Sequence, residues 1–262
     1  IAFNSSASVK LLHGDRGKLS ANLIEAALRE ENVHYPSTSL VSVENTTNKG
    51  GGSCYDLKTL EELSILCKSK KLNFHMDGAR LFNAMVHTNT KPKDYGYLFD
   101  SISVCMSKGL GAPIGSILLG TKVFIQKAKR VRKVLGGGMR QIGYLAAACD
   151  YAIDNHLSLL KDDHRRAKEI ESVLLSLDYV TEVISVETNI LIFVLLSETR
   201  KSISAPIDLP IQLDCIILTL FGQFSKLSRS FKSSSEYLLI FKNHWDNFFF
   251  STTAPDLHPL PS

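Results

Sequence analysis

Strand-like and helix-like segments alternate along the first part of the chain, and this alternation restricts the fold more than any other feature. Short apolar runs with strand character and longer segments with helical spacing of apolar residues follow one another. The expected strands are residues 40–44, 72–76, 101–106 and 116–119, and the expected helices are 21–31, a helix capped by Asp56, 122–134, 139–155 and 159–177. This order predicts an α/β fold around a mostly parallel sheet.

The chain changes character near residue 200, which suggests its domain organisation. Two further apolar strands, 179–186 and 190–195, favour the start of a smaller unit. Residues 201–262 hold 7 of the 13 phenylalanines and 1 of the 16 glycines, without a sustained period. We expect a large domain over 1–157, the start of a small, incomplete C-terminal domain over 158–200, and an unrelated, poorly ordered tail over 201–262.

Composition excludes several classes of function. Lys and Arg number 30 against 26 Asp and Glu, so the net charge of +4 does not require a nucleic-acid partner. The basic run 122–133 has no interleaved aromatic platforms for bases and is interpreted as a solvated helix face. No run reaches the ~20 apolar residues of a membrane helix. Five cysteines without a paired spacing favour a reducing compartment, the cytosol, and no metal site is expected.

The first candidate site residues are Asp77 and Arg80, which follow the expected strand 72–76. Side chains at the carboxyl ends of strands in an α/β sheet line the ligand crevice, and Gly78 leaves room for close approach. The alternative is structural: Asp77 caps the next helix and Arg80 is its surface partner.

Lys108 is the candidate nucleophile. It lies between an apolar strand and a loop that contains Gly109, Gly111 and Gly115, within an otherwise uncharged stretch. A lysine in apolar surroundings tends to lose its proton and then serves in Schiff-base chemistry. The alternative is a solvated loop lysine.

Arg140 follows three glycines, residues 136–138, which are expected to lead directly into a helix. Backbone N–H groups at a helix start attract anions, and an arginine adds a bidentate donor for phosphate. Glycine runs are equally common in turns, so this signal is weak alone. Together, a lysine anchor, a carboxylate for a ring nitrogen and phosphate donors are the parts of a pyridoxal 5'-phosphate site.

Three ordered motifs carry a family resemblance: HMDGARLFNA, DSISVCMSKGLGAPIGSILLG and RKVLGGGMRQIGYLAAA. They resemble the L-threonine aldolase family, including low-specificity and L-allo-threonine aldolases, within the aspartate-aminotransferase-like fold, type I of the pyridoxal-phosphate enzymes. The resemblance runs from about residue 11 to residue 196. It implies a carbon–carbon lyase that cleaves L-threonine or L-allo-threonine to glycine and acetaldehyde, as a homo-oligomer built as a dimer of dimers.

The resemblance also assigns roles by motif. Lys108 would be the Schiff-base lysine, Asp77 the partner of the pyridine nitrogen, and Arg80 a neighbour of the phenolic oxygen. Arg140 would reach the cofactor phosphate, often across a subunit boundary.

The chain departs from the family pattern at several points. The upstream phosphate loop and ring-stacking histidine have no counterpart, and Thr47 stands where the family has a histidine near the substrate hydroxyl. We therefore expect a chain truncated at its N-terminus. Two alternatives stay open: a catalytically impaired remnant of the family, and a related β-eliminating lyase.

Overall fold

The computed structural model describes residues 1–30, 32–196 and 216–219. In this part of the chain, helices separate β1, β2 and β3, and β4 follows β3 without an intervening helix. The helices are α1 (Ala2–Ser5), α2 (Ala21–Ala27), α3 (Leu57–Ser69), α4 (Leu81–Thr88), α5 (Pro92–Gly96), α6 (Lys122–Val134), α7 (Gly143–His156), a 3-10 turn η1 (Leu157–Leu159) and α8 (Leu160–Leu174). The strands are β1 (Leu40–Glu44), β2 (Asn73–Gly78), β3 (Ser101–Cys105), β4 (Ser116–Gly120), β5 (Val180–Val183), β6 (Ile190–Leu195) and β7 (Ile216–Thr219).

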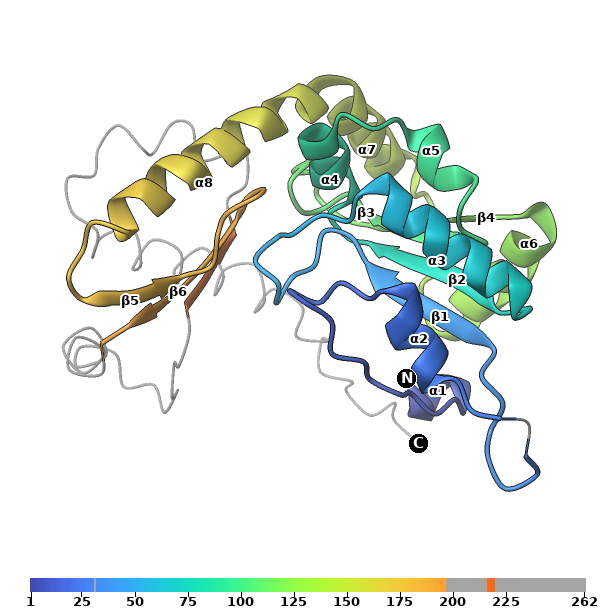
Figure 1. The fold of residues 1–262 in the computed structure, drawn as a ribbon. Coiled ribbons are helices and arrows are strands. Elements are labelled where there is room, and N and C mark those ends of the chain that lie inside the picture. The colour runs from blue at the N-terminus through green and yellow to red at the C-terminus, as the bar shows by residue number, and fades with distance from the viewer. Residues whose placement is uncertain (31, 197–215, 220–262) are drawn as a thin grey trace, which may run out of the picture.

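The larger sheet has the strand order β1-β2-β3-β4 (Figure 1). The first three strands are parallel, and β4 runs antiparallel to β3. In this register Glu44 lies opposite Asp77, which lies opposite Ser103. The carboxyl ends of β1, β2 and β3 therefore meet at one edge of the sheet, as the α/β prediction requires.

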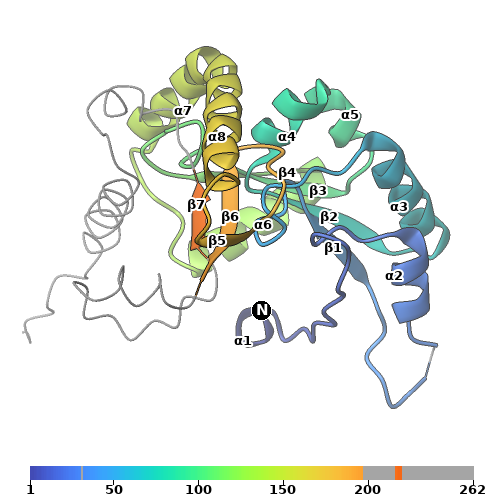
Figure 2. The same cartoon turned by 60° about the vertical axis from the view of Figure 1, so that its left-hand side comes forward.

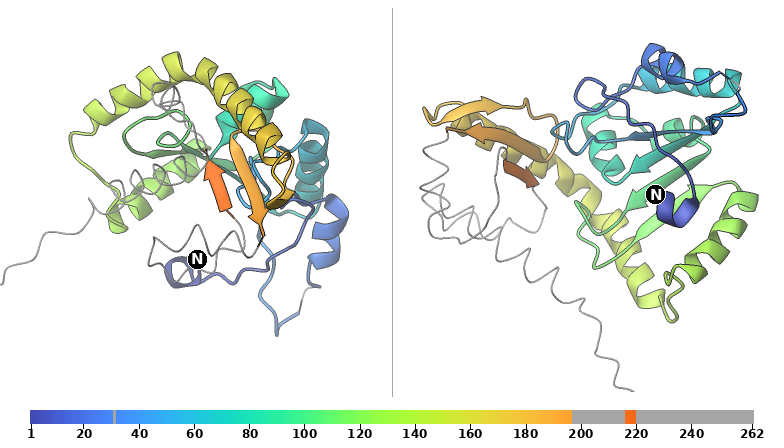
Figure 3. Two further views of the ribbon diagram at one scale, coloured as in Figure 1. Left: turned by 90° about the vertical axis from the view of Figure 1, so that its left-hand side faces the viewer. Right: turned by 90° about the horizontal axis from the view of Figure 1, so that it is seen from below.

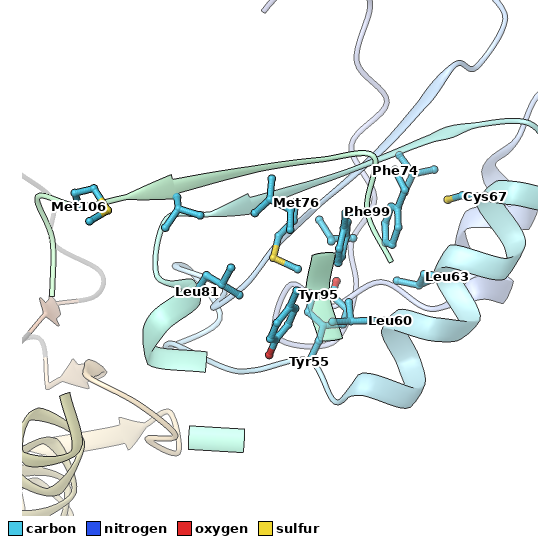
Figure 4. Close-up of a cluster of buried hydrophobic side chains, with 14 of the residues drawn as sticks. Tyr55, Leu60, Leu63, Cys67, Phe74, Met76, Leu81, Tyr95, Phe99 and Met106 are labelled. Atoms are coloured by element: carbon cyan, nitrogen blue, oxygen red, sulfur yellow. The ribbon is translucent and has the colours of Figure 1, made fainter. Parts of the chain in front are cut away.

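One face of this sheet forms the main core, which Figure 4 shows in part. Alternate side chains of the strands point to it, because the side-chain period of a strand is two residues. Phe74 and Met76 of β2 are buried there, and Phe74 stacks on Phe99 with ring centroids 4.2 Å apart. The predicted apolar stripe of α3 packs against them, with Leu60 and Leu63 at 0% exposure.

The opposite face is more open within the described residues. Ser42 and Asp77 are exposed on it. The three large apolar side chains of β4 are all exposed, but only Leu118, opposite Ser103, lies on this face, whereas the other two lie opposite Ile102 and Val104 on the core side. Those three are Ile117, Leu118 and Leu119. Because parallel sheets are ordinarily covered on both faces, this exposed apolar strand is a surface to which another chain segment or another chain can pack.

The first prediction concerns the start of α3. Asp56 is its N-cap: the carboxylate accepts from the Thr59 backbone N–H at 2.8 Å and from the Thr59 hydroxyl at 2.9 Å. We expect Asp56→Ala to lower the free energy of unfolding by about 1 kcal/mol, as loss of an N-cap typically does. Urea denaturation measures this, with Lys58→Ala, an exposed position in the first turn of the same helix, as control. Equal stability of the two variants would contradict the assignment of the cap.

A second, smaller sheet has the order β5-β6-β7, all antiparallel (Figure 2). It packs on α8 through an apolar cluster of Ala167, Leu174, Val186, Leu191, Phe193 and Leu195. The views in Figure 3 show the two sheets apart, with α8 reaching from one to the other. The domain limits at residues 157 and 200 stay predictions. The expected tail lies outside the described residues except for β7, which pairs with β6.

The structure corrects some predicted element bounds. The helix expected over 21–31 ends at Ala27, whose carbonyl accepts from the Lys10 ammonium at 2.8 Å instead of continuing the helix. The helix expected from residue 139 begins only at Gly143, and the short helices α4 and α5 were not expected. Among the described residues, none of the helices combines the length and apolar character needed to cross a bilayer.

Candidate functional site

The candidate site lies at the carboxyl edge of the three parallel strands. β1 ends at Glu44, β2 contains Asp77 one residue before its end, and Lys108 follows β3 by three residues. The parallel register aligns these strand ends, so the loop with Lys108 leaves the sheet beside the strand that carries Asp77. The structure thus brings two of the four predicted site residues to adjacent strand ends.

Asp77 is exposed, on the open face of the sheet. One carboxylate oxygen accepts from the Ala79 backbone N–H at 3.0 Å, which fixes the side chain over the turn after β2. Within the described residues Asp77 makes no ion pair. The N-cap of the following helix α4 is Arg80, so Asp77 is not its cap, and this part of the structural alternative was wrong.

Arg80 is buried, with 8% of its surface exposed, and its Nε and Nη1 atoms have no hydrogen-bond partner. Burial lowers the pKa of this guanidinium, and the nearby Glu44, Cys105 and Asp77 act in the opposite direction. An unpaired buried guanidinium is costly, so the site favours a ligand that brings oxygen acceptors. Arg80 is therefore not a surface partner, as the structural alternative had it.

Two further unpaired donors follow β1, and sequence reasoning did not single them out. Asn45 and Thr46 are both fully buried, and Asn45 Nδ2 and Thr46 Oγ1 lack partners. Asn45 is held in place because its backbone N–H donates to the Asp77 carbonyl and its Oδ1 accepts from Tyr55 N–H. Together with Arg80, these residues leave buried donors without partners just after β1 and β2.

Lys108 is half-buried in a loop that is stabilised by hydrogen bonds between its own backbone groups. Gly111 N–H donates to the Lys108 carbonyl at 2.9 Å, and Ala112 N–H donates to the Met106 carbonyl at 3.1 Å. Gly111 has φ +68°, a conformation that glycine adopts without strain. The Lys108 ammonium makes no hydrogen bond or ion pair with the part of the chain described, so it is free to react with a ligand.

The helix start expected at Arg140 is not observed, because α7 begins only at Gly143. The three glycines do not lead into α7; they end α6, because Gly136 N–H and Gly137 N–H donate to the carbonyls of Lys133 and Arg132. Arg140 therefore does not lie at the start of a helix. Arg140 itself is exposed, and no contact joins it to Asp77, Arg80 or Lys108 in the described ranges.

Thr47, which stands at the position of the family histidine, is 2% exposed. Its hydroxyl donates to the Arg16 carbonyl at 2.9 Å and lies 2.7 Å from the Ser53 hydroxyl. The hydroxyl is therefore satisfied within the turn, in contrast to its neighbours Asn45 and Thr46.

One group of potential metal ligands, not expected from the sequence, comes together in the described residues: Cys54, His87 and Glu187. Glu187 is already engaged, since it pairs with Arg16 and accepts from Cys54 N–H at 2.8 Å. Burial, followed by the charge of Glu187, raises the pKa of the Cys54 thiol to about 12. A protonated thiol beside a guanidinium is a poor cation site, and we interpret the group as a junction between the two sheets.

Comparison with known proteins places this geometry in context. A model of the beta-eliminating lyase family matches residues 1–197. Low-specificity L-threonine aldolase 1 of Arabidopsis thaliana is 42% identical over 178 residues, which cover 67% of this chain and 50% of that protein. The low specificity L-threonine aldolase of Escherichia coli is 40% identical over 151 residues, or 58% of this chain and 44% of the relative. The chain spans about half the length of the curated relatives it matches.

Solved structures agree on the fold. A candidate L-allo-threonine aldolase from Listeria monocytogenes superposes with a TM-score of 0.70 at 22% identity, over 83% of this chain and 63% of that one. Leishmania major threonine aldolase gives a TM-score of 0.66 at 21% identity, over 82% and 65%. These likenesses confirm the aspartate-aminotransferase-like α/β fold expected from the sequence. Since the family model covers three quarters of the residues, the chain belongs to the beta-eliminating lyase family.

Proposed function

We propose that this protein binds pyridoxal 5'-phosphate and cleaves L-threonine or L-allo-threonine to glycine and acetaldehyde. The observation that carries the proposal is the pairing of an unpartnered Lys108 with Asp77 at adjacent strand ends, beside the unsatisfied donors of Arg80. The names of the Arabidopsis and Escherichia coli relatives support this choice of substrate.

The residues of the site divide the work by their chemistry. When bound, the cofactor would supply an electron sink for the pair released as the substrate Cα–Cβ bond breaks. Lys108 would hold the cofactor through its amine and accept a proton when substrate takes its place. Asp77 would keep a proton on the ring nitrogen, because a carboxylate favours the charged form of its partner. Arg80 would donate to the ring oxygen.

A homo-oligomer, a dimer of dimers, is part of the proposal. Besides β4, helix α6 buries no residue in this chain, and it exposes both apolar and basic side chains. Arg140 follows this helix and is exposed without a contact in the described residues. A second chain on this surface would cover the apolar side chains and would let Arg140 reach the phosphate in the partner's site.

We place the protein in the cytosol. Four cysteines lie in the described residues, Cys54, Cys67, Cys105 and Cys149, and all are free thiols. Free thiols fit a reducing compartment.

A product assay tests the proposed reaction. Threonine and the purified chain with added cofactor should give glycine and acetaldehyde in equal amounts. Ammonia and a 2-oxo acid would instead identify the β-eliminating alternative. Absence of both product sets, with no absorbance retained by the protein after unbound cofactor is removed, would identify a catalytically impaired remnant and overturn the proposal.

A further inference from the structure

The loop that carries Lys108 rests on a buried polar side chain from another element. A Cβ added at Gly109 would lie 3.2 Å from Asn83 Oδ1 and 3.0 Å from Leu160 Cδ2. The backbone at Gly109 therefore packs closely against side chains of α4 and α8, which leave no space for a side chain at this position. Since Gly109 is adjacent to Lys108, a shift of Asn83 or Leu160 would move the amine.

Asn83 is itself fixed by a histidine 81 positions later. Asn83 is 2% exposed, and its Nδ2 lies 3.1 Å from Nε2 of His164 on α8. An amide nitrogen only donates, so His164 accepts at Nε2 and carries its proton on Nδ1. Burial, and secondarily His87, lowers the pKa of His164 to about 4, which keeps the ring neutral at pH 7 and the acceptor available.

A second histidine, His156, makes a hydrogen bond to the backbone of the same loop. Nδ1 of His156, at the end of α7, lies 2.6 Å from the Leu110 carbonyl, to which it donates. Leu110 is 2% exposed. With its backbone held at Leu110 and packed at Gly109, Lys108 has a fixed Cα, and only its side chain remains free to move toward a ligand.

We infer that Asn83 and His164 are positioning residues for Lys108. The hydrogen bond between Asn83 and His164 fixes the backbone next to Lys108 and thereby the position from which the lysine amine extends. This inference rests on the proposed function. From His164, α8 continues to the apolar cluster that it shares with the smaller sheet (Figure 1). The hydrogen bond between Asn83 and His164 therefore connects that sheet to the loop with Lys108. Neither residue touches the proposed substrate or cofactor; both act through the backbone of residues 108–110.

Three variants test the pair, with two measurements. His164→Leu removes the acceptor, and His164→Gln restores a side chain that can accept from Asn83. The exposed His13→Leu is the matched control. The first measurement is the rate at which pyridoxal 5'-phosphate is captured at residue 108, read by borohydride reduction and peptide mass. The second, on the cofactor-free chain, is hydrogen exchange of the peptide that contains Gly111 and Ala112.

We expect His164→Leu to slow capture by about 10- to 100-fold, because a displacement near 1 Å has effects of that order. His164→Gln should stay within about 3-fold of the original chain, and His13→Leu should match it. Exchange of the loop should quicken in His164→Leu only. If His164→Leu does not fold, Gly109→Ala disturbs the same contact from the loop side, and the same slowing is expected.

Capture at the original rate in both His164→Leu and Gly109→Ala would overturn the inference. So would an equal loss in His164→Gln and His164→Leu. If the original chain captures no cofactor at Lys108, the proposed function fails, and this outcome is distinct because hydrogen exchange still reports on the loop. Unchanged exchange in His164→Leu would refute the positioning role even then.

Discussion

Lys108→Ala is expected to abolish covalent cofactor binding and to lower turnover of threonine by at least about 1000-fold, since it removes the amine that is proposed to hold the cofactor. After incubation with pyridoxal 5'-phosphate and removal of the unbound cofactor, the original chain should keep a visible absorbance band that borohydride removes, and the variant should keep none. Lys108 is half-buried and has no polar partner among the described residues. The variant should therefore lose activity because the amine is absent, with little decrease in stability.

Two control variants distinguish loss of the reactive amine from loss of positive charge and from general effects of replacing a lysine. Lys108→Arg keeps the positive charge but offers no reactive amine, so it should be as inactive as Lys108→Ala. Lys93→Ala removes an exposed lysine of α5, away from the site and from the proposed subunit interface, and should leave both the band and the turnover unchanged. A visible band or measurable turnover in Lys108→Ala would show that another residue holds the cofactor.

Local pattern predicted much of the fold where neighbouring residues decide the structure. The strand at 40–44 and the helix at 122–134 were predicted with the bounds that the structure shows. In α6, Thr121 supplies an N-cap bond to Phe124 N–H, a signal that lies within the element itself. The start of α7 could not be predicted, because the glycines before it satisfy the carbonyls of α6 instead.

In the candidate site, too, some features could be predicted from local sequence and others could not. The position of Asp77 and Lys108 at neighbouring strand ends could be predicted, because each lies at or after the end of an apolar run and the ends of parallel strands share one edge. The missing partners of Asn45, Thr46 and Arg80 could not, because whether a buried donor is paired depends on every neighbour in space. The bond between Asn83 and His164 was equally hidden, since neither residue has a local signal.

The second large effect is expected for Asp77→Asn, whose side chain is nearly the same size. The amide oxygen can still accept from Ala79 N–H, so the turn after β2 should be kept. The amide carries no charge, however, and cannot hold a proton on a ring nitrogen. We expect turnover to fall by about 100- to 1000-fold, as on removal of one aligned electrostatic contact, while the cofactor is still captured at Lys108.

This retained capture distinguishes the role of Asp77 from that of Lys108. Asp77→Glu restores the negative charge on a longer side chain and should recover part of the turnover, whereas the exposed Asp178→Asn, which also removes one carboxylate, should change nothing. Steady-state kinetics together with the absorbance of the captured cofactor measure both effects. Turnover of Asp77→Asn equal to that of the original chain would mean that the ring nitrogen faces another group, and the assignment of this strand end to the cofactor would then be wrong.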